Sequence, residues 1–575
     1  MKFFISVLVC FLFTYQSYAM VCKASADSDI VSKLSAAKVL QALMEKDLAL
    51  KQIQDELAEN FINIYKPLSK GDTPKVEDRA TKALTDGEKN VLAMFKLLDS
   101  RMGLDVAIEQ LLADPRVQAK LPENSDAQSQ YLIGELVKLI RFQFEILGLN
   151  SENSNSANKM MDWHKHGEKL TKKGKQLQKE LKSRLAKHPD REAPETRSLL
   201  IKSILQREFQ LKFGQSTNAE ILSINRHAFA KRRKLVQKAK KSIFISIWSI
   251  YDDKSGVAYQ KDLVEAAARG VEIKIIVDGN VAKKPKHNRI INELALVDGI
   301  DVVFYHDKEK ASFGYHVKTM IVDSEHLLTG GRNVGDVYTS FNDKTEKWLD
   351  TDIYTKGSVA LVAENRFRKD WVKNSAIPIK AAKQRIDLNE SNQSLSAYYQ
   401  QEAGSSKLMD MMILSIYLAE FEVNIANAYV ISNPALKAAI QDAISRKVKV
   451  SIFTNSQTSV DEPVVSVPIL MTAKEYAEMG AKVYLKKGST LHSKTMLIDR
   501  RLSFIGSLNF HPRSAILEAE SAFVSLNLNT SHRLVPILAR DYHPSVSSLI
   551  DPKVDSEIPY NLLSVVALRL FYEQL

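Results

Sequence analysis

The sequence repeats one motif, HVKTMIVDSEHLLTGGRN over residues 316–333 and HSKTMLIDRRLSFIGSLN over residues 492–509. Each copy has a histidine, a lysine two residues later, an aspartate five residues after the lysine, and a glycine-containing corner that ends in asparagine. The apolar residues between lysine and aspartate are bulky or β-branched and too few for a helix, so each copy is predicted to contain a β-strand. Side chains alternate between the faces of a strand. The histidine and lysine of each copy therefore share one face, and the aspartate has the opposite parity.

These residues suit phosphodiester chemistry if the two copies come together. One imidazole can attack phosphorus while the other protonates the leaving oxygen. Lysine and asparagine can hold the non-bridging oxygens, so no metal or other cofactor is expected. By their parity, the aspartates are expected to fix the strand ends rather than to touch substrate. The candidate catalytic residues are His316, Lys318, Asp323, His492, Lys494 and Asp499, with Asn333 and Asn509 as candidate substrate-binding residues.

At these residues the chain resembles the two-motif members of the phospholipase D superfamily. The runs GGRNVGDVY (330–338) and TNSQTSVD (454–461) resemble more narrowly the bacterial cardiolipin synthases of the C type. The resemblance covers roughly residues 220–550 and rests on the repetition, because a single His-x-Lys is usually a surface pair. It implies two halves that pack with their motifs facing each other across a pseudo-two-fold axis, which makes one site per monomer. The alternative is a degenerate relative without chemistry, and the presence of both histidines and both lysines argues against it.

The resemblance also suggests supporting residues. Asp350 matches an acidic strand and is expected to orient His316, and Glu520 lies where the family keeps the corresponding carboxylate of the second half. A carboxylate fixes the second nitrogen of a catalytic imidazole. His511 stands where an aspartate is usual and Glu518 where an asparagine is usual, which puts acceptor selection near that loop in doubt.

Between about residues 220 and 550 the sequence alternates helix and strand in two similar series, separated by the polar stretch 389–406. We predict an α/β fold of two phospholipase D-like α-β-α halves, 220–388 and 407–550, sharing one active site and preceded by an all-α N-terminal region, 28–215. Asn427 and Tyr429 match the family's Asn-Ala-Tyr strand, although an ordinary sheet position is the favoured interpretation. The predicted strands are 242–248, 271–278, 302–305, 423–429, 448–454 and 481–485, and the predicted helices are 232–241, 256–270, 413–422 and 434–445.

The N-terminal residues are typical of an export signal. Lys2 precedes an apolar run and a small-x-small site at residues 17–19, with a second candidate site at 24–26. An uncleaved anchor and lipidation at Cys22 are alternatives. Removal of residues 1–19 takes away one lysine and no acidic residue, which lowers the formal net charge from +12 to +11. It also removes Cys10 and leaves Cys22 as the single cysteine, so no intramolecular disulfide is expected.

Four further segments are given no catalytic role. Residues 28–150 show helical periodicity, and 151–159 read as a linker. Residues 164–188 carry many lysines, interpreted as a solvated helix face or as a contact with anionic lipid. Residues 551–575 include an apolar stripe from Pro559, predicted to be a C-terminal helix that packs in the core or faces a membrane.

The predicted function is phosphatidyl transfer between phospholipids to form cardiolipin-type lipids, with a phosphohistidine at His316 and proton transfer by His492. That order of roles comes from the resemblance. The alternatives are a phospholipase D-type hydrolase, a secreted nuclease on the same site, and a non-catalytic membrane-binding protein. Tyrosyl-DNA phosphodiesterase is disfavoured because that branch lacks the aspartates seen at 323 and 499. We expect an exported, periplasmic or membrane-associated monomer whose partners are phospholipids at an anionic surface, with nucleic acid ranked behind lipid.

Overall fold

The computed structural model describes five segments of the chain, residues 163–305, 313–341, 347–379, 394–462 and 465–551. They lie in one compact unit, residues 160–558. The predictions for the export signal, for residues 28–150, for the linker and for the C-terminal helix fall outside the described segments.

The first half is built on a seven-stranded sheet in the order β2-β9-β8-β7-β3-β4-β5. Strands β3, β4 and β5 are parallel, and β7, β8, β9 and β2 continue the sheet in antiparallel pairs. The strands are β2 Thr217–Leu222, β3 Ser242–Ile247, β4 Glu272–Asp278, β5 Ile300–Tyr305, β7 Thr319–Val322, β8 His326–Gly330 and β9 Asp352–Lys356. The helices are α12 Asn225–Lys238, α13 Lys254–Ala268, α14 Pro285–Leu294, α15 Asp336–Thr339 and α16 Ser358–Asn374.

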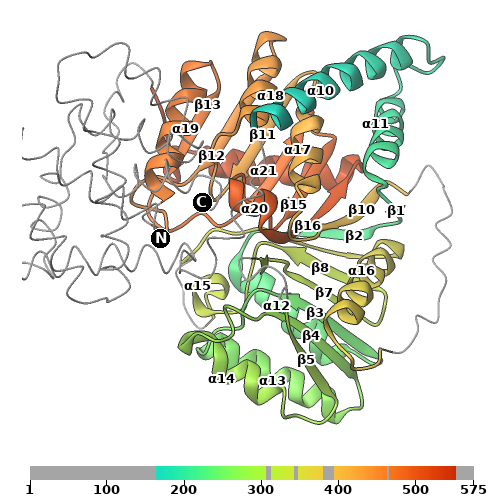
Figure 1. Ribbon diagram of the computed structural model, residues 1–575, viewed down its shortest axis with the longest axis vertical. Helices are drawn as coiled ribbons and strands as arrows, with labels where there is room; N and C mark the ends of the chain where they lie inside the picture. The colour runs from blue at the N-terminus through green and yellow to red at the C-terminus, as the bar shows by residue number, and fades with distance from the viewer. Residues whose placement is uncertain (1–162, 306–312, 342–346, 380–393, 463–464, 552–575) are drawn as a thin grey trace, which may run out of the picture. The chain divides into compact units, whose positions relative to one another are not determined.

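The second half repeats this arrangement in a ten-stranded sheet, ordered β1-β10-β16-β15-β14-β11-β12-β13-β17 with β6 added beside β16. Strands β11, β12 and β13 correspond to the parallel strands of the first half. The strands are β1 Phe213–Gly214, β6 Gly314–Tyr315, β10 Ser396–Gln401, β11 Glu422–Asn427, β12 Lys449–Thr454, β13 Lys482–Lys486, β14 Lys494–Ile498, β15 Leu502–Gly506, β16 Glu518–Ser525 and β17 Ser547–Leu549. The helices are α17 Lys407–Tyr417, α18 Pro434–Ser445, α19 Ser466–Glu478, α20 Pro512–Ile516 and α21 Leu528–Asp541. Figure 1 shows the two halves one above the other, and the predicted duplication is confirmed.

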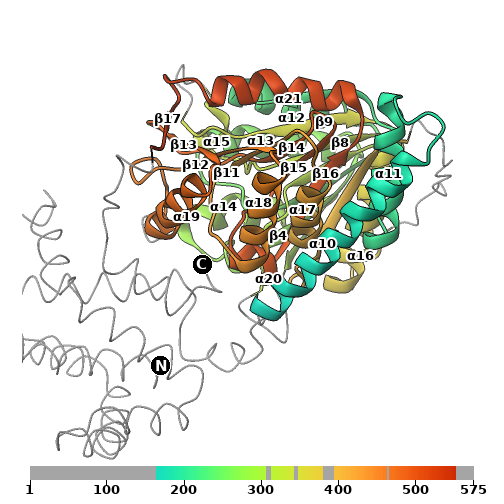
Figure 2. The same ribbon diagram turned by 90° about the horizontal axis from the view of Figure 1, so that it is seen from above.

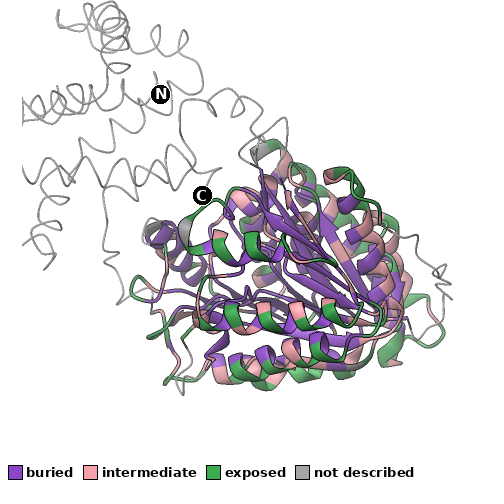
Figure 3. Ribbon diagram, turned by 90° about the horizontal axis from the view of Figure 1, so that it is seen from below, coloured by how far each residue is buried: buried purple, intermediate pink, exposed green. Residues whose placement is uncertain are grey.

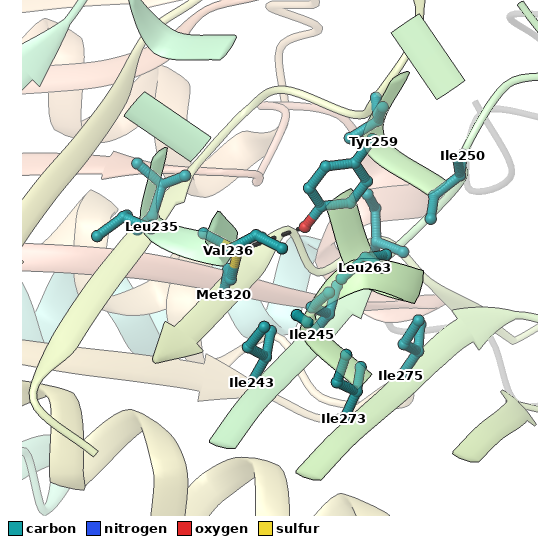
Figure 4. Packing of buried hydrophobic residues seen from close by; sticks show 14 of the residues in the cluster. Leu235, Val236, Ile243, Ile245, Ile250, Tyr259, Leu263, Ile273, Ile275 and Met320 are labelled. Atoms are coloured by element: carbon teal, nitrogen blue, oxygen red, sulfur yellow. Dashed lines mark hydrogen bonds between the residues drawn. The ribbon is translucent and has the colours of Figure 1, made fainter. Parts of the chain in front are cut away.

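Strands β3 and β4 are buried on both faces because helices cover both sides of the first sheet. All six residues of β3 are buried, which explains its nearly unbroken apolar sequence, SIFISI. On one face, Ile243 and Ile245 pack with α12 and α13 (Figure 4), where the Tyr259 hydroxyl donates to the sulfur of Met320 at 3.3 Å. Figure 3 shows the same pattern, with buried strands inside and mixed exposure on the outer helices.

The other face of the first sheet shares one apolar core with the second sheet. Phe244 of β3 and Phe523 of β16 belong to this cluster, together with residues of α16 and α21. Phe244 stacks on Phe367 of α16, with ring centroids 5.1 Å apart. Figure 2 shows α21 running along the top of the unit. The two halves are therefore held together by a continuous hydrophobic core.

Each half also sends a short segment into the other. Strand β6 of the first half pairs in parallel with β16 of the second, and the Leu349 backbone forms a bridge with Leu491. The His316 N–H donates to the Ala519 carbonyl at 2.9 Å, and the His492 N–H donates to the Leu349 carbonyl at 2.7 Å. These exchanged segments place both histidines at the boundary between the halves.

Two expectations about the elements need correction. The polar stretch 389–406 contains a strand, β10, which pairs with β16 and whose Ala397 and Tyr398 are buried. The polar residues around β10 hid the periodicity by which a strand is predicted. The helix expected over 413–422 begins earlier and ends at Tyr417, because the backbone at 420–422 is held in place by Asp499 ahead of β11.

The basic segment 164–188 forms helix α10, Trp163–Ala186, and α11 Pro194–Phe209 follows it. Both helices contact α17 of the second half, and α10 also packs along α18 (Figure 1). Within the described segments, every helix is too short or too polar to cross a bilayer.

Candidate active site

The exchanged segments bring the two His-x-Lys pairs into one site. His316 lies between β6 and β7, and His492 lies just before β14. Their side chains are 12% and 7% exposed, and the Lys318 and Lys494 residues are 1% and 2% exposed. The sequence pattern predicted that these four residues belong together, and the structure does bring them together at one boundary.

Each imidazole is oriented by a carboxylate of the opposite half. His316 Nδ1 lies 2.9 Å from Glu520 Oε1, and His492 Nδ1 lies 2.7 Å from Asp350 Oδ2. The expectation that Asp350 orients His316 is therefore wrong. The reason is the segment exchange, because β6 sets His316 beside the strand that carries Glu520, while the Leu349 bridge sets Asp350 beside His492.

Both carboxylates are held by further hydrogen bonds. Glu520 accepts from the hydroxyls of Ser514, at 2.6 Å, and Ser507. Asp350 accepts from the Thr351 N–H at 2.7 Å. The glycine-containing corner differs between the halves because each corner packs against the carboxylate of its own half. A side chain at Gly331 would collide with the Asp350 carboxylate, whereas the corresponding Ser507 donates to Glu520.

The two lysines are buried and, among the described residues, have no direct carboxylate partner. Lys318 Nζ donates to the His316 carbonyl at 2.7 Å, and Lys494 Nζ donates to the His492 carbonyl. Burial lowers the pKa of Lys318 to about 7 and that of Lys494 to about 8. An anionic group beside both lysines would raise both pKa values again, so the site suits a phosphoryl group.

His492 is enclosed by aromatic rings. The Trp348 ring stacks on the imidazole at 5.4 Å, and the Tyr338 ring meets it edge-on at 5.0 Å. Burial, followed by the charges of Lys494 and Lys318, holds the pKa of His492 well below its ordinary value. A bound phosphate would offset the lysines and raise that pKa towards the range needed for proton transfer.

The two aspartates of the motifs are structural groups. Asp323 accepts from the backbone N–H groups of residues 240, 241 and 242, and Asp499 accepts from those of residues 420, 421 and 422. Both occupy the left-handed region, with φ of 54° and 51°. They tie the end of the motif strand to the start of its neighbour, as their parity indicates. Their place in the candidate catalytic set is therefore corrected to a structural one.

The asparagines at the ends of the two motifs are buried. Asn333 and Asn509 are 2% and 3% exposed. Asn333 Nδ2 donates to the Tyr338 hydroxyl at 3.2 Å, and within the described segments the Oδ1 atom of each asparagine has no hydrogen-bond partner. Burying a polar atom without a hydrogen bond costs folding free energy, and such a cost is expected where side chains bind substrate.

A second carboxylate stands near His316. Glu518 Oε2 lies 4.0 Å from His316 Nδ1 and accepts from Ser514 Oγ at 3.0 Å, and its Oε1 accepts from Arg513 Nε at 2.9 Å. Burial opposes ionisation, but His316 and Arg513 outweigh it and lower the pKa of Glu518. His511 Nδ1 accepts from the Ser514 N–H at 3.1 Å, and burial lowers its pKa to about 3. This neutral imidazole forms the N-cap of α20.

Within the described segments, one group of side chains has metal-ligand spacing. The ligand atoms of His316, Glu518 and Glu520 lie within 4.8 Å of one another, although the sequence shows no such cluster. All three already have hydrogen-bond partners, and Arg513 adds a positive charge. The arrangement fits an imidazole held by carboxylates better than a metal centre.

Two aromatic residues complete the surroundings, and sequence reasoning missed one of them, Trp248. Trp248, just beyond β3, meets the His316 ring at 6.2 Å, and Lys318 Nζ lies 5.9 Å from its ring centroid. The Tyr429 hydroxyl donates to Asp461 Oδ1 at 2.5 Å. Asn427 is structural, because its amide holds the backbone of residues 508 and 510. The position of Trp248 at a strand end beside the motif strand is the one signal that could have revealed it.

The two halves match the same family model. Residues 233–371 and 412–541 each match the family described as "Cardiolipin synthase, PLD-like domain". The matches begin in α12 and α17 and end in α16 and at the end of α21, so they follow the structural duplication.

Relatives with assigned names are cardiolipin synthases at low identity. Cardiolipin synthase A of Pseudomonas syringae is 26% identical over 316 residues, and that of Pseudomonas putida is 25% identical over 318 residues. These matches cover 54% and 53% of this chain and 65% and 64% of the relatives, so the chain spans less than two thirds of each relative's length. An uncharacterized Helicobacter pylori protein is 26% identical over 382 residues, covering 53% of this chain and 76% of its own.

Among solved structures, phosphatidylserine synthase of Haemophilus influenzae matches with a TM-score of 0.52 at 15% sequence identity. The match covers 65% of this chain and 99% of that one. At this identity the likeness shows a shared fold, and it agrees with the family match in both halves.

Proposed function

Because the chain belongs to the phospholipase D superfamily of enzymes, we propose that it transfers phosphatidyl groups between phospholipids to form a cardiolipin-type lipid. The observation that carries this proposal is the pair of imidazoles, each backed by a carboxylate of the opposite half, beside two buried lysines. The names of the relatives support lipid as the substrate class.

In the first step, His316 attacks the phosphorus of the donor lipid. Its Nδ1 is engaged with Glu520, which leaves Nε2 as the nucleophile. A P–N bond forms, and the P–O bond to the headgroup alcohol breaks. His492, whose Nδ1 faces Asp350, gives the proton on its Nε2 to the departing oxygen. Lys318 and Lys494 stabilise the charge on the non-bridging oxygens in the transition state.

In the second step, His492 Nε2 takes the proton from the hydroxyl of the acceptor lipid. The acceptor oxygen attacks phosphorus, a new P–O bond forms and the P–N bond breaks. Glu520 and the nearby Glu518 stabilise the positive charge that the His316 ring carries when it is phosphorylated. The enclosed position of His492 favours a hydroxyl delivered by a bound lipid over free water.

The proposal includes the location of the enzyme. The signal-like residues 1–19 would carry the mature chain across the inner membrane, where lipid headgroups are present and DNA is scarce. Its positive charge would favour an anionic membrane surface.

One experiment separates transfer from its rivals. Purified mature protein is given vesicles of phosphatidylglycerol and phosphatidylethanolamine and, separately, supercoiled plasmid. Cardiolipin together with released glycerol or ethanolamine is the expected result. Phosphatidic acid as the main product would identify a hydrolase instead. Nicked plasmid with unchanged lipid, absent in the His316→Asn variant, would identify a nuclease and overturn the lipid reaction.

A further inference from the structure

A cavity lies at the end of β7 that is remote from the catalytic histidines. It has a volume of about 170 Å³. His316 and Lys318 precede β7, whereas Asp323 follows it, which separates the cavity from the catalytic imidazole by roughly 20 Å of extended chain. The cavity, here called the α12 pocket, is lined by Lys231, Lys234, Leu235, Lys238, Val322, Asp323, His326 and Tyr354.

The α12 pocket has a surplus of positive charge. Lys231, Lys234 and Lys238 are spaced three and four residues apart, so they form one row along the helix, where like charges repel. Lys231 Nζ pairs with Glu220 at 2.6 Å, but among the described residues Lys234 and Lys238 form no ion pair, and both are exposed. The carboxylate in the lining, Asp323, is already bound by three backbone N–H groups.

The wall of the α12 pocket is apolar and aromatic. Leu235 and Val322 are buried, and the Tyr354 ring lies 4.4 Å from Lys231 Nζ. The Tyr354 hydroxyl lies 2.9 Å from His326 Nδ1, which fixes that ring in the lining. Cationic groups above an apolar wall match a ligand that combines a phosphoryl group with carbon chain.

The second half shows that the fold does not require this lysine row. Helix α17 precedes β11 as α12 precedes β3, but nine of its residues, Leu408 to Tyr417 without Asp410, are buried. Helices α10 and α11 pack against α17, and Arg197 of α11 reaches to 3.9 Å from Asp499, the counterpart of Asp323. In the first half the same position is open and basic among the described residues. The duplicated fold therefore forms without this cationic row, and the row is available to bind a ligand.

We propose that the α12 pocket is a second, non-catalytic site for a phosphoryl group and that its ligand is the headgroup of an anionic phospholipid. The lysines bind the phosphate oxygens, and the apolar wall accepts the adjoining glycerol carbons. Occupation of this site holds the protein at a membrane surface. The inference does not depend on the proposed transfer reaction, because binding is measured without turnover.

The test compares two matched double variants of the full mature chain. Lys234→Gln/Lys238→Gln removes two exposed charges of α12, and Lys175→Gln/Lys179→Gln removes two exposed charges of α10 with the same spacing. The α10 pair is not part of the lining of the α12 pocket. Binding to vesicles of phosphatidylglycerol and phosphatidylethanolamine is measured by sedimentation at two salt concentrations. The α12 variant should bind at least tenfold more weakly, and the α10 variant within threefold of the wild type.

A second arm identifies the source of the phosphoryl group. Millimolar inorganic phosphate is added and the unfolding temperature is followed. Weaker vesicle binding by the α12 variant supports a lipid headgroup. A phosphate-induced rise that is smaller only in that variant, with vesicle binding unchanged, supports a free phosphate and overturns the lipid source. Equal behaviour of both variants in both assays overturns the site. Turnover of a water-soluble phosphodiester should be unchanged in the α12 variant, which shows that the catalytic site is intact.

Discussion

The two halves share a backbone plan but surround their histidines differently. His316 is the more open imidazole and has two carboxylates nearby, Glu520 at 2.9 Å and Glu518 at 4.0 Å. His492 has one carboxylate, Asp350, and is enclosed by the rings of Trp348 and Tyr338. Two carboxylates favour an imidazole that becomes positively charged, as a phosphohistidine does. The comparison teaches that a duplicated fold can divide one reaction between unequal copies.

The largest expected effect comes from removing either histidine. His316→Asn and His492→Asn should each lower the turnover of phospholipid by about 10⁴–10⁶-fold. They should differ in a trapping experiment with labelled phospholipid, denatured at alkaline pH, where phosphohistidine survives. His316→Asn should carry no label, whereas His492→Asn should retain it, because nucleophilic attack remains and release is slow.

The wild-type protein is the control for trapping, with the label mapped to a peptide. Label found on the peptide of His492 would reverse the division of labour between the halves. If neither the wild type nor His492→Asn carried label while the wild type continued to turn over phospholipid, a covalent intermediate would be ruled out.

The crossed carboxylates provide the next test of the comparison. Glu520→Gln should lower turnover by about 10²–10⁴-fold and lose labelling, as His316→Asn does, because Glu520 orients His316. Asp350→Asn should lower turnover similarly but retain the label, as His492→Asn does. If Asp350→Asn abolished labelling and Glu520→Gln did not, each carboxylate would serve its own half.

A lysine of the site links activity with stability. Burial lowers the pKa of Lys318 to about 7, so the unfolded chain binds more protons between about pH 7 and 10.5, and native stability rises with pH in that window. Lys318→Met should lower turnover by about 10²–10³-fold. It should also raise the free energy of unfolding at pH 7 by about 1–4 kcal/mol, a gain that shrinks towards pH 10. Denaturant unfolding at several pH values measures this, and a gain independent of pH would contradict the burial of an uncharged lysine.

A smaller effect should follow from an ion pair that only the first half has. Arg332 lies 3.5 Å from Asp352 and donates to Asn225 and to the Asp350 carbonyl, whereas the corresponding residues of the second half are Leu508 and Ala522. Arg332→Leu should destabilise the protein by about 3–5 kcal/mol, because it leaves Asp352 buried and unpaired.

The double variant Arg332→Leu/Asp352→Ala, which copies the second half, should recover part of that loss. Its turnover should fall about tenfold, since Arg332 positions the backbone of Asp350. A double variant less stable than Arg332→Leu would show that the two sites do not compensate each other.

The smallest expected effect is that of a chelator. Lys318 and Lys494 take the electrostatic part that a metal would play, so activity on dispersed lipid should be unchanged by chelation. Activity lost on chelation and restored by a divalent cation would instead assign a catalytic metal to His316, Glu518 and Glu520.

The duplication and the meeting of the two His-x-Lys pairs could be predicted because they depend on local patterns. The motif repeats in full, strand parity separates Asp323 from His316, and apolar runs mark most of the core strands, such as β3 and β4. The structure places Asp323 and Asp499 at the strand ends, where the parity argument put them.

The carboxylate pairing and strand β10 could not be predicted, because they depend on contacts between distant segments. The family resemblance of the acidic strand suggested that Asp350 serves His316, but the exchange through β6 and Leu349 is set by tertiary packing. In β10, Tyr398 and Gln400 are buried because each has a hydrogen-bond partner. The polar sequence of this strand does not reveal those partners. The aromatic enclosure of His492 was missed because Trp348 and Tyr338 lie in loops and a short helix without periodicity.

The crossed carboxylates have an evolutionary consequence. After most duplications one copy is free to drift, because the other preserves the original activity. Here each copy holds the group that orients the other's histidine, so a change at Glu520 damages the first copy and a change at Asp350 damages the second. Neither copy can be discarded, and selection must treat the pair as one gene product. Divergence can then proceed at positions such as the surface of α12, which do not contribute to the histidine site of the other copy.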